Sequence, residues 1–267
     1  MVNYISIQEA RAASGLRVVL AAGSISPWSE ALKQILFLKG VPFAWVQSKM
    51  PGPDPELQAW TAQTSMPVTV WNDERPRSSW MEQLYLAERL GPQPALIPDS
   101  IDDRITMFGL INEVAGENGL SWCKRLIMLH QRITDDSDAP VVHHRFKDRE
   151  GFVNYARYLG SKYGYDPQAV AKAPERVASI LARLNAQLQR QREAGSKYYL
   201  GRQLCALDVY SASFSLTLSP SPPEWTPTMS PAQRAGITPE PLMERFAEII
   251  EHRNFIYNEH LKLPIEF

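Results

Sequence analysis

An apolar strand, a short serine-rich turn and an amphipathic helix follow one another between residues 17 and 40. The run Arg17–Ala22 is apolar after its first residue and predicts a buried strand. Apolar residues then recur at helical spacing from Pro27 onward, and Gly40 provides the C-terminal stop. Pro27 suits the first helical position and Ser26 the cap before it. The pattern therefore places the hydroxyls of Ser26 and Ser29 at the positive end of a helix.

Length and composition limit the classes of protein to which the chain can belong. Its 267 residues suit two packed domains, and its 44% hydrophobic and 21% charged residues are ordinary globular values. A net charge of −1 gives no reason to expect binding to nucleic acid or to an anionic membrane. Its apolar stretches are far shorter than the ~20 residues of a membrane-spanning helix. No signal peptide is visible at the start, so a cytoplasmic protein is expected.

Cysteines and histidines give no metal-binding pattern. Cys123 and Cys205 lie far apart in helical patterns, and we expect both thiols to stay free. His143 and His144 are adjacent and would point apart on a helix, with no ligand-spaced cysteine or aspartate beside them. The remaining histidines are expected at the surface or at an interface: His130, His252 and His260. We therefore expect no bound metal.

The first 90 residues predict alternating strands and helices. Residues 1–15 read as an extension, in which Ser6 and Glu9 could form a capping box. The expected elements are strands at 16–22 and 43–48, helices at 27–39 and 55–62, a hairpin over 68–78 and a helix at 79–90. This order predicts a small mixed sheet with helices on both faces.

A proline-rich linker over 91–100 separates this domain (1–90) from an expected all-helical domain over 101–267. Four helices are marked by apolar spacing, around 107–114, 177–188, 207–216 and 242–250. The polar stretch 135–150 predicts a mobile connection. The five prolines within 219–231 exclude regular helix there.

Three motifs together resemble the glutathione transferase family, nearest to its serine- and cysteine-type classes (zeta-like and omega-like). The first is Ser26-Pro27-Trp28-Ser29 followed by Leu38-Lys39-Gly40-Val41-Pro42-Phe43. The second is Ser65-Met66-Pro67-Val68-Thr69-Val70. The third is Ser78-Ser79-Trp80-Met81-Glu82-Gln83-Leu84-Tyr85-Leu86-Ala87-Glu88, where the family has E-S-x-A-I-x-x-Y-L-x-E. Ser79 and Tyr85-Leu86 match that pattern, whereas Ser78 stands at its acid and Glu82 at an apolar position.

The helical domain supports the resemblance with one further motif. Gly201–Val209 is similar to the family's G-x-x-x-[ST]-x-A-D, a capping box that opens a buried helix. Asp208 keeps the acid of that motif, and Cys205 replaces its Ser or Thr. The implied fold is an N-terminal thioredoxin-like domain followed by the family's all-helical C-terminal domain.

The resemblance implies a glutathione site around Ser26. A thiol with a pKa of about 8.5 is only a few per cent ionised at neutral pH, so a hydroxyl donor and a positive helix end assist it. Ser26 is the candidate catalytic residue, with Ser24 and Ser29 as competitors, and a plain N-cap is its other reading. Trp28 is expected to belong half to the core and half to the wall of the site.

The other implied glutathione-binding residues lie in the second and third motifs. A cis bond before Pro67 would let the main chain of Met66 hold the cysteinyl part of glutathione like an added strand. An ordinary trans edge residue is the alternative. Ser79, at a helix start, can bind the γ-glutamyl carboxylate or only cap the helix. Ser78 would accept the ligand's ammonium group less well than the acid of the family.

The sequence thus predicts a homodimeric enzyme that activates the glutathione thiol for conjugation to, or exchange with, a small electrophile. Glutathione is the co-substrate. A glutathione-dependent isomerase is one alternative. A non-catalytic relative that binds a protein partner is another, and Ser78 and Glu82 favour it slightly.

Overall fold

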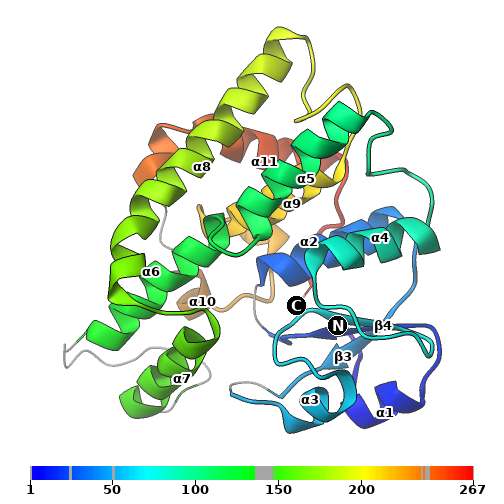
Figure 1. Ribbon diagram of the computed structural model, residues 1–267, viewed down its shortest axis with the longest axis vertical. Helices are drawn as coiled ribbons and strands as arrows, with labels where there is room; N and C mark the ends of the chain where they lie inside the picture. The colour runs from blue at the N-terminus through cyan, green and yellow to red at the C-terminus, as the bar shows by residue number, and fades with distance from the viewer. Residues whose placement is uncertain are drawn as a thin grey trace.

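The N-terminal part of the chain is a four-stranded mixed sheet covered by helices on both faces (Figure 1). The computed structural model describes residues 2–23, 26–49, 52–135, 146, 148–235, 237 and 241–266. The strands are β1 (Tyr4–Ile5), β2 (Leu16–Leu20), β3 (Ala44–Gln47) and β4 (Val68–Trp71). The helices are α1 (Ile7–Ala12), α2 (Pro27–Leu38), α3 (Pro55–Thr61) and α4 (Trp80–Leu90). The sheet order is β1-β3-β2-β4, in which only β4 is antiparallel to its neighbour. The predicted mixed sheet is confirmed.

Alternation along β2 decides which layer each side chain joins. Leu16, Val18 and Leu20 face the large core that α2 and α4 share with the helical part of the chain. Val19 faces the opposite way, into a smaller core with residues of α1 and α3. The two helix pairs therefore lie on opposite faces of the sheet (Figure 1).

The segment 1–15 differs from the expected extension. The capping box of Ser6 and Glu9 is present and opens α1. The residues before it, however, form β1, which pairs in parallel with β3 at the edge of the sheet. The second strand of the expected hairpin over 68–78 is reduced to one bridge between Thr69 and Arg77. With only two residues, β1 is too short to show the alternation by which a strand is recognised in a sequence.

The end of α2 follows its sequence signal and ties the helix to the linker. Gly40 adopts a φ of 62°, and the N–H of Val41 bonds to the carbonyl of Leu36, a Schellman arrangement. The buried Lys39 ammonium donates to the carbonyls of Gly91 and Pro94 and pairs with Glu88 at 2.8 Å. The linker is thus fastened to the first domain by a buried cation.

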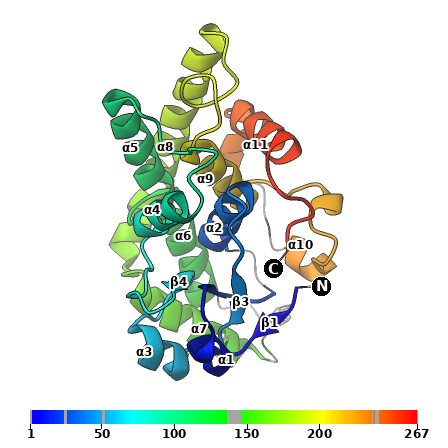
Figure 2. The same cartoon turned by 90° about the vertical axis from the view of Figure 1, so that its right-hand side faces the viewer.

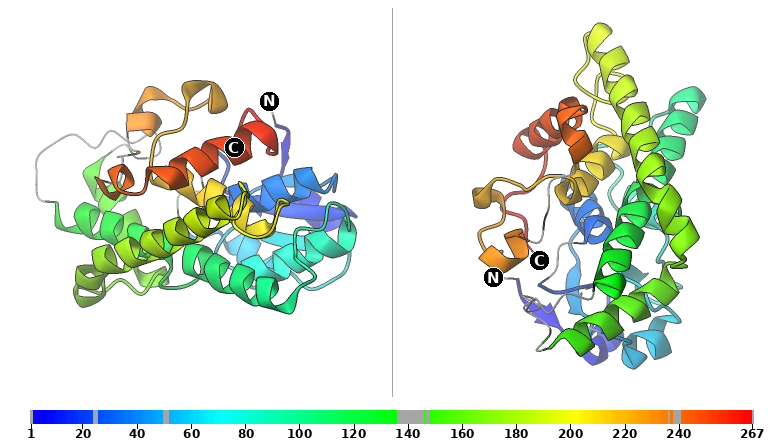
Figure 3. Two further views of the ribbon diagram at one scale, coloured as in Figure 1. Left: turned by 90° about the horizontal axis from the view of Figure 1, so that it is seen from above. Right: turned by 90° about the vertical axis from the view of Figure 1, so that its left-hand side faces the viewer.

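The rest of the chain is helical (Figure 2). Its α-helices are α5 (Ile101–Ala115), α6 (Leu120–Thr134), α7 (Arg149–Lys162), α8 (Pro167–Glu193), α9 (Ala206–Phe214), α10 (Pro231–Ala235) and α11 (Ala247–Glu259). Short 3-10 turns occur at η1 (Ser215–Thr217), η2 (Pro223–Trp225) and η3 (Pro241–Glu244). The long α8, yellow-green in the right-hand view of Figure 3, crosses in front of the other helices.

Three of the four helices expected in this part correspond to α5, α8 and α9. The helix expected over 242–250 is instead η3, then a break, then α11, which runs on to Glu259. The segment 219–231 contains η2 and otherwise no regular helix before α10 begins at its last residue. Most of the expected connection over 135–150 lies outside the described residues.

The buried α9 joins the two parts of the molecule by packing against α2, α5 and α11. Its Asp208 carboxylate accepts a hydrogen bond from the N–H of Cys205 at 2.8 Å, as the capping motif predicts. The same carboxylate lies 3.0 Å from Nε2 of His252, which is only 3% exposed. The expectation of a surface His252 was wrong, because α11 places this ring against α9. Cys123 and Cys205 are free thiols, as expected.

Candidate functional site

The sheet brings the three candidate segments to one end. Val19 of β2 pairs with Val68 of β4, so the chain leaving β2 toward Ser26 runs beside the chain entering β4 from Met66. The bridge between Thr69 and Arg77 places the residues after Arg77 on the other side of the β4 entry. Antiparallel pairing continued by two residues sets Ser79 opposite Pro67. The segments around Ser26, Met66 and Ser79 therefore lie at the same end of the sheet, although they are far apart in the sequence.

Ser26 is the N-cap of α2, and Pro27 follows at the first helical position, as predicted. Its hydroxyl accepts from the N–H of Ser29 at 3.4 Å, a long bond. Ser26 is half-buried. The partial positive charge of the α2 N-terminus lies at the same point. The Ser26 hydroxyl thus accepts one long hydrogen bond and can donate its O–H, at a point where a thiolate would be stabilised. Its competitor Ser24 lies outside the described residues.

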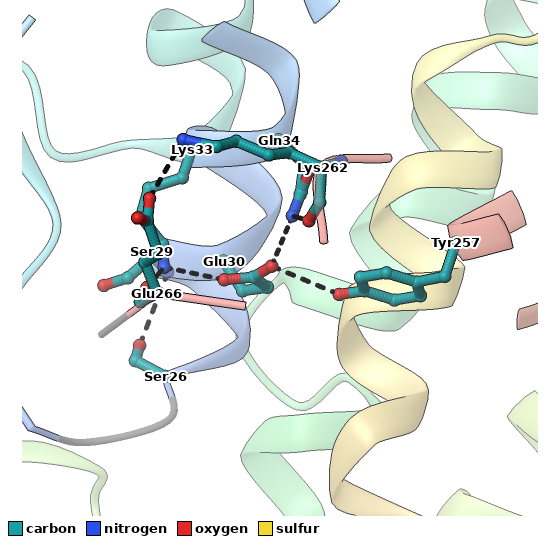
Figure 4. A network of polar contacts seen from close by, with 8 residues as sticks. All are labelled: Ser26, Ser29, Glu30, Lys33, Gln34, Tyr257, Lys262 and Glu266. Atoms are coloured by element: carbon teal, nitrogen blue, oxygen red, sulfur yellow. Dashed lines mark hydrogen bonds and ion pairs between the residues drawn. The ribbon is translucent and has the colours of Figure 1, made fainter. Parts of the chain in front are cut away.

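Ser29 has a different environment. It is 5% exposed, and its buried hydroxyl has no hydrogen-bond partner among the described residues. The next residue, Glu30, is also buried and pairs with Lys33 at 2.7 Å. Its carboxylate accepts further bonds from Gln34 at 2.7 Å and from the Tyr257 hydroxyl at 3.3 Å (Figure 4). Burial, followed by the Glu30 charge, raises the pKa of Tyr257, so this hydroxyl stays protonated as a donor.

The C-terminal segment completes this network on the turns of α2 that follow Ser26 (Figure 4). The Gln34 side-chain amide exchanges two hydrogen bonds with the main chain of Lys262, at 2.7 and 3.0 Å. The Lys33 ammonium donates to the main-chain carbonyl of Glu266. The C-terminal segment thereby fixes the orientation of the helix that presents Ser26. Neither the burial of Glu30 nor its partners left a local signal in the sequence.

The Met66–Pro67 peptide bond is cis, which confirms the prediction. Within the described parts of the chain, no hydrogen bond engages the main-chain N–H or C=O of Met66. The buried Gln83 of α4 donates its amide to the carbonyl of Pro67 at 2.9 Å and to that of Arg77 at 3.1 Å. Gln83 therefore holds the second and third candidate segments together. Sequence reasoning missed this residue, because a glutamine on a helix resembles any surface residue.

Ser78 and Ser79 are both exposed at the start of α4. The Ser78 hydroxyl donates to Oε1 of Gln63 at 2.9 Å. Ser79 occupies the N-cap position, yet its side chain makes no capping hydrogen bond. The Ser79 hydroxyl therefore does not cap the helix. Its O–H and the N–H groups of the first turn of α4 can donate hydrogen bonds to an anion.

Trp28 connects the site to the helical domain. Its indole N–H donates to the carbonyl of Ala115, at the end of α5, over 2.8 Å. Its ring meets that of Phe214 edge-to-face, with centroids 5.1 Å apart. The side chain is half-buried, as expected for a residue shared between core and site wall. No grouping of three or more His, Cys, Asp or Glu side chains suited to a metal occurs in the described ranges.

Known structures identify this arrangement, although sequence comparisons do not. No family model and no curated protein matches the chain. A glutathione S-transferase from Methylobacillus flagellatus with glutathione bound superposes with a TM-score of 0.60 at 12% identity, covering 92% of this chain and 96% of its own. The Methylobacterium radiotolerans glutathione S-transferase in complex with glutathione sulfonate gives 0.59 at 13% identity, covering 92% of both chains. Glutathione transferase Omega 3C from Trametes versicolor gives 0.55 at 11% identity, covering 95% of this chain and 84% of its own. The chain therefore has the glutathione S-transferase fold, a thioredoxin-like domain followed by a helical domain.

Proposed function

We propose that this protein is a glutathione transferase that activates the thiol of glutathione for attack on a small electrophile. The observation that carries the proposal is the half-buried Ser26 at the N-terminus of α2, at the same end of the sheet as Met66, whose main chain receives no hydrogen bond from the described residues. Structures of this fold from Methylobacillus and Methylobacterium hold glutathione or its sulfonate, which supports the choice of ligand.

In this proposal each residue has one task. Ser26 donates a hydrogen bond to the sulfur and, with the helix dipole, favours the thiolate. The main chain of Met66 pairs with the cysteinyl residue in the manner of an added strand. Ser79 receives the γ-glutamyl carboxylate at the start of α4. Trp28 forms part of the wall, and Ser29 contributes its main-chain N–H, which donates to the Ser26 hydroxyl. The thiol proton leaves to solvent, the new carbon–sulfur bond forms, and the leaving group departs from the electrophile.

The test is a titration with glutathione followed by a turnover assay. Calorimetry with millimolar glutathione is expected to show binding to one site per chain, and a chlorodinitrobenzene assay is expected to show conjugation. Binding without turnover on any electrophile would favour the isomerase. Absence of binding would contradict the proposal and favour a protein-interaction module. A structure with glutathione soaked in locates the sulfur relative to Ser26.

We also propose that the protein is a homodimer. Four large apolar side chains are exposed on α4 and α5, which lie on one side of the molecule (Figure 2): Met81 at 39%, Tyr85 at 44%, Ile101 at 73% and Ile105 at 66%. Tyr85 stacks on Phe108 with centroids 5.6 Å apart, so the patch continues from one helix to the other. An apolar patch that spans two domains is typical of a protein interface.

The proposed compartment is the cytoplasm. Cys123 and Cys205 are both unpaired and buried, as in proteins of reducing compartments, where glutathione is held reduced. Within the described residues, no helix has both the length and the apolar character to cross a bilayer.

A further inference from the structure

A cluster of cations lies on α6 and α7, on the helical side of the Met66 edge. Its members are Arg125, Arg132 and Lys162. Among the described residues, none of the three is within ion-pair distance of a carboxylate. Arg157, on α7 as well, is exposed, whereas these three are partly buried.

Arg125 lies near both of the other cations, since its guanidinium is 5.5 Å from the ring of Tyr163, the residue that follows Lys162, and Arg132 lies about two turns further along the same face of α6. Burial, and secondly the nearby Arg125 guanidinium, lowers the pKa of Lys162. Burial, and secondly Arg125 again, lowers the pKa of Arg132 to about 10. Gathering like charges in a partly buried place is unfavourable unless an anion occupies it. A binding site for an anion is the simplest function that offsets this cost.

Aromatic rings surround the cluster. Lys162 lies 5.6 Å from the centroid of Tyr158, and Arg125 lies 5.5 Å from that of Tyr163. Tyr163 in turn meets Trp122 edge-to-face at 4.7 Å. Such rings provide flat apolar surface beside the charges. A ligand that carries both an anionic group and a ring would satisfy both features.

A direct contact joins this cluster to the proposed glutathione edge. The Lys162 ammonium donates to the main-chain carbonyl of Thr64, two residues before Met66. An ammonium has three donors, so two remain for a ligand. The charge therefore stands next to the strand edge at which the cysteinyl residue of glutathione would lie.

We propose that Arg125 and Lys162 bind the carboxylate or sulfonate of an acidic aromatic electrophile, so that the substrate class of this enzyme is the anionic aromatic acids. The inference rests on the proposed function, since it names the second substrate of the same site. Glutathione has carboxylates but no ring, whereas the rings of Tyr158, Tyr163 and Trp122 suit an aromatic acid. For a chloroaromatic acid, the thiolate sulfur bonds to the ring carbon that bears chlorine, and that carbon–chlorine bond breaks to release chloride.

The test compares two probes that differ only in charge: para-chloro-meta-nitrobenzoate and its neutral carboxamide. Calorimetry without glutathione measures the binding of each, and an assay with glutathione then measures kcat/KM. The native protein is expected to prefer the acid over the amide by about tenfold or more at low salt, with the preference falling as salt rises. Arg125→Met and Lys162→Met are expected to remove most of that preference. Lys162→Gln, which keeps a donor for Thr64, is a second variant should Lys162→Met fold poorly.

Matched controls and opposing outcomes separate the alternatives. Arg157→Met and Lys172→Met remove exposed cations from α7 and α8 and are expected to keep the preference for the acid. Equal affinity of the native protein for the two probes overturns the inference. So does a loss of glutathione affinity in Lys162→Met with the acid preference intact, since the cation would then serve glutathione. Acid-selective binding without conjugation of either probe would leave the anion site standing and contradict the proposed transferase function.

Discussion

Two serines one turn apart in α2 have opposite environments. Ser26 is half-buried and its hydroxyl makes one long capping bond, whereas the hydroxyl of Ser29 is buried without a partner among the described residues. At the residue scale, this difference predicts that replacement by alanine affects activity at Ser26 more than at Ser29.

We expect Ser26→Ala to lower kcat/KM with chlorodinitrobenzene about 10- to 150-fold, the equivalent of a charge-assisted hydrogen bond of ~1.5–3 kcal/mol. The lost cap should cost about 0.5 kcal/mol of unfolding free energy, since the bond is long. Ser29→Ala is the matched control: it removes an unpartnered hydroxyl and should retain most activity and full stability. The measurements are steady-state kinetics, thermal unfolding and the ultraviolet absorbance of bound thiolate. Full turnover in Ser26→Ala would remove the catalytic assignment.

Ser78 is exposed at the position where the motif that the chain resembles has an acid, and among the described residues its hydroxyl bonds to Gln63. We expect Ser78→Glu to tighten glutathione binding by at most about tenfold, because an exposed ion pair contributes ~0–1 kcal/mol. The gain should shrink with salt. Ser179→Glu, an exposed position on α8, controls for the added charge. Unchanged or weaker binding in calorimetry would mean that Ser78 does not face the ammonium group of the ligand.

At the scale of elements, one glutamine connects α4 to the entry of β4. Gln83 is 3% exposed and donates to two main-chain carbonyls, those of Pro67 and Arg77. We expect Gln83→Leu to lower the free energy of unfolding by ~1–3 kcal/mol, because the buried Pro67 carbonyl loses its donor, whereas the Arg77 carbonyl keeps the N–H of Thr69. It should also weaken glutathione binding, since Met66 and Ser79 flank these carbonyls. Calorimetry and denaturant unfolding measure the two effects.

The control for this variant is Gln58→Leu, an equal change at an exposed position of α3. It should leave both stability and glutathione affinity unaltered within error. A stable Gln83→Leu protein with native affinity would show that α4 positions the β4 entry by packing alone.

At the scale of the whole molecule, the exposed patch on α4 and α5 predicts the assembly. We expect the double variant Ile101→Glu/Ile105→Glu to be a monomer in sedimentation equilibrium, because charges would be buried without partners in an apolar interface. Both side chains are largely exposed in the single chain, so the folded monomer should lose little intrinsic stability. Ala182→Glu/Ala186→Glu adds the same charges at the same spacing on α8 and should stay dimeric. A native protein that sediments as a monomer would contradict the proposal.

The sequence by itself determined the elements that depend on neighbouring residues. Ser26 and Pro27 begin α2, Gly40 ends it, and the Ser6 capping box opens α1, because caps act within one helical turn. The order of strands and helices, the cis bond before Pro67 and the two-part architecture also followed from motifs in the chain. These features depend on neighbouring residues or on a known sequence motif, so they can be predicted without the tertiary structure.

Only the tertiary structure decided which distant groups meet. Gln83 finds the Pro67 carbonyl, Glu30 finds Tyr257, and Lys162 reaches Thr64 across the molecule. None of these pairs leaves a local pattern, because a buried polar side chain is stable only through partners that folding supplies. The short β1 and the burial of His252 were missed for the same reason. Sequence placed the candidate serine at a helix end, whereas packing determined which charges lie near the proposed site.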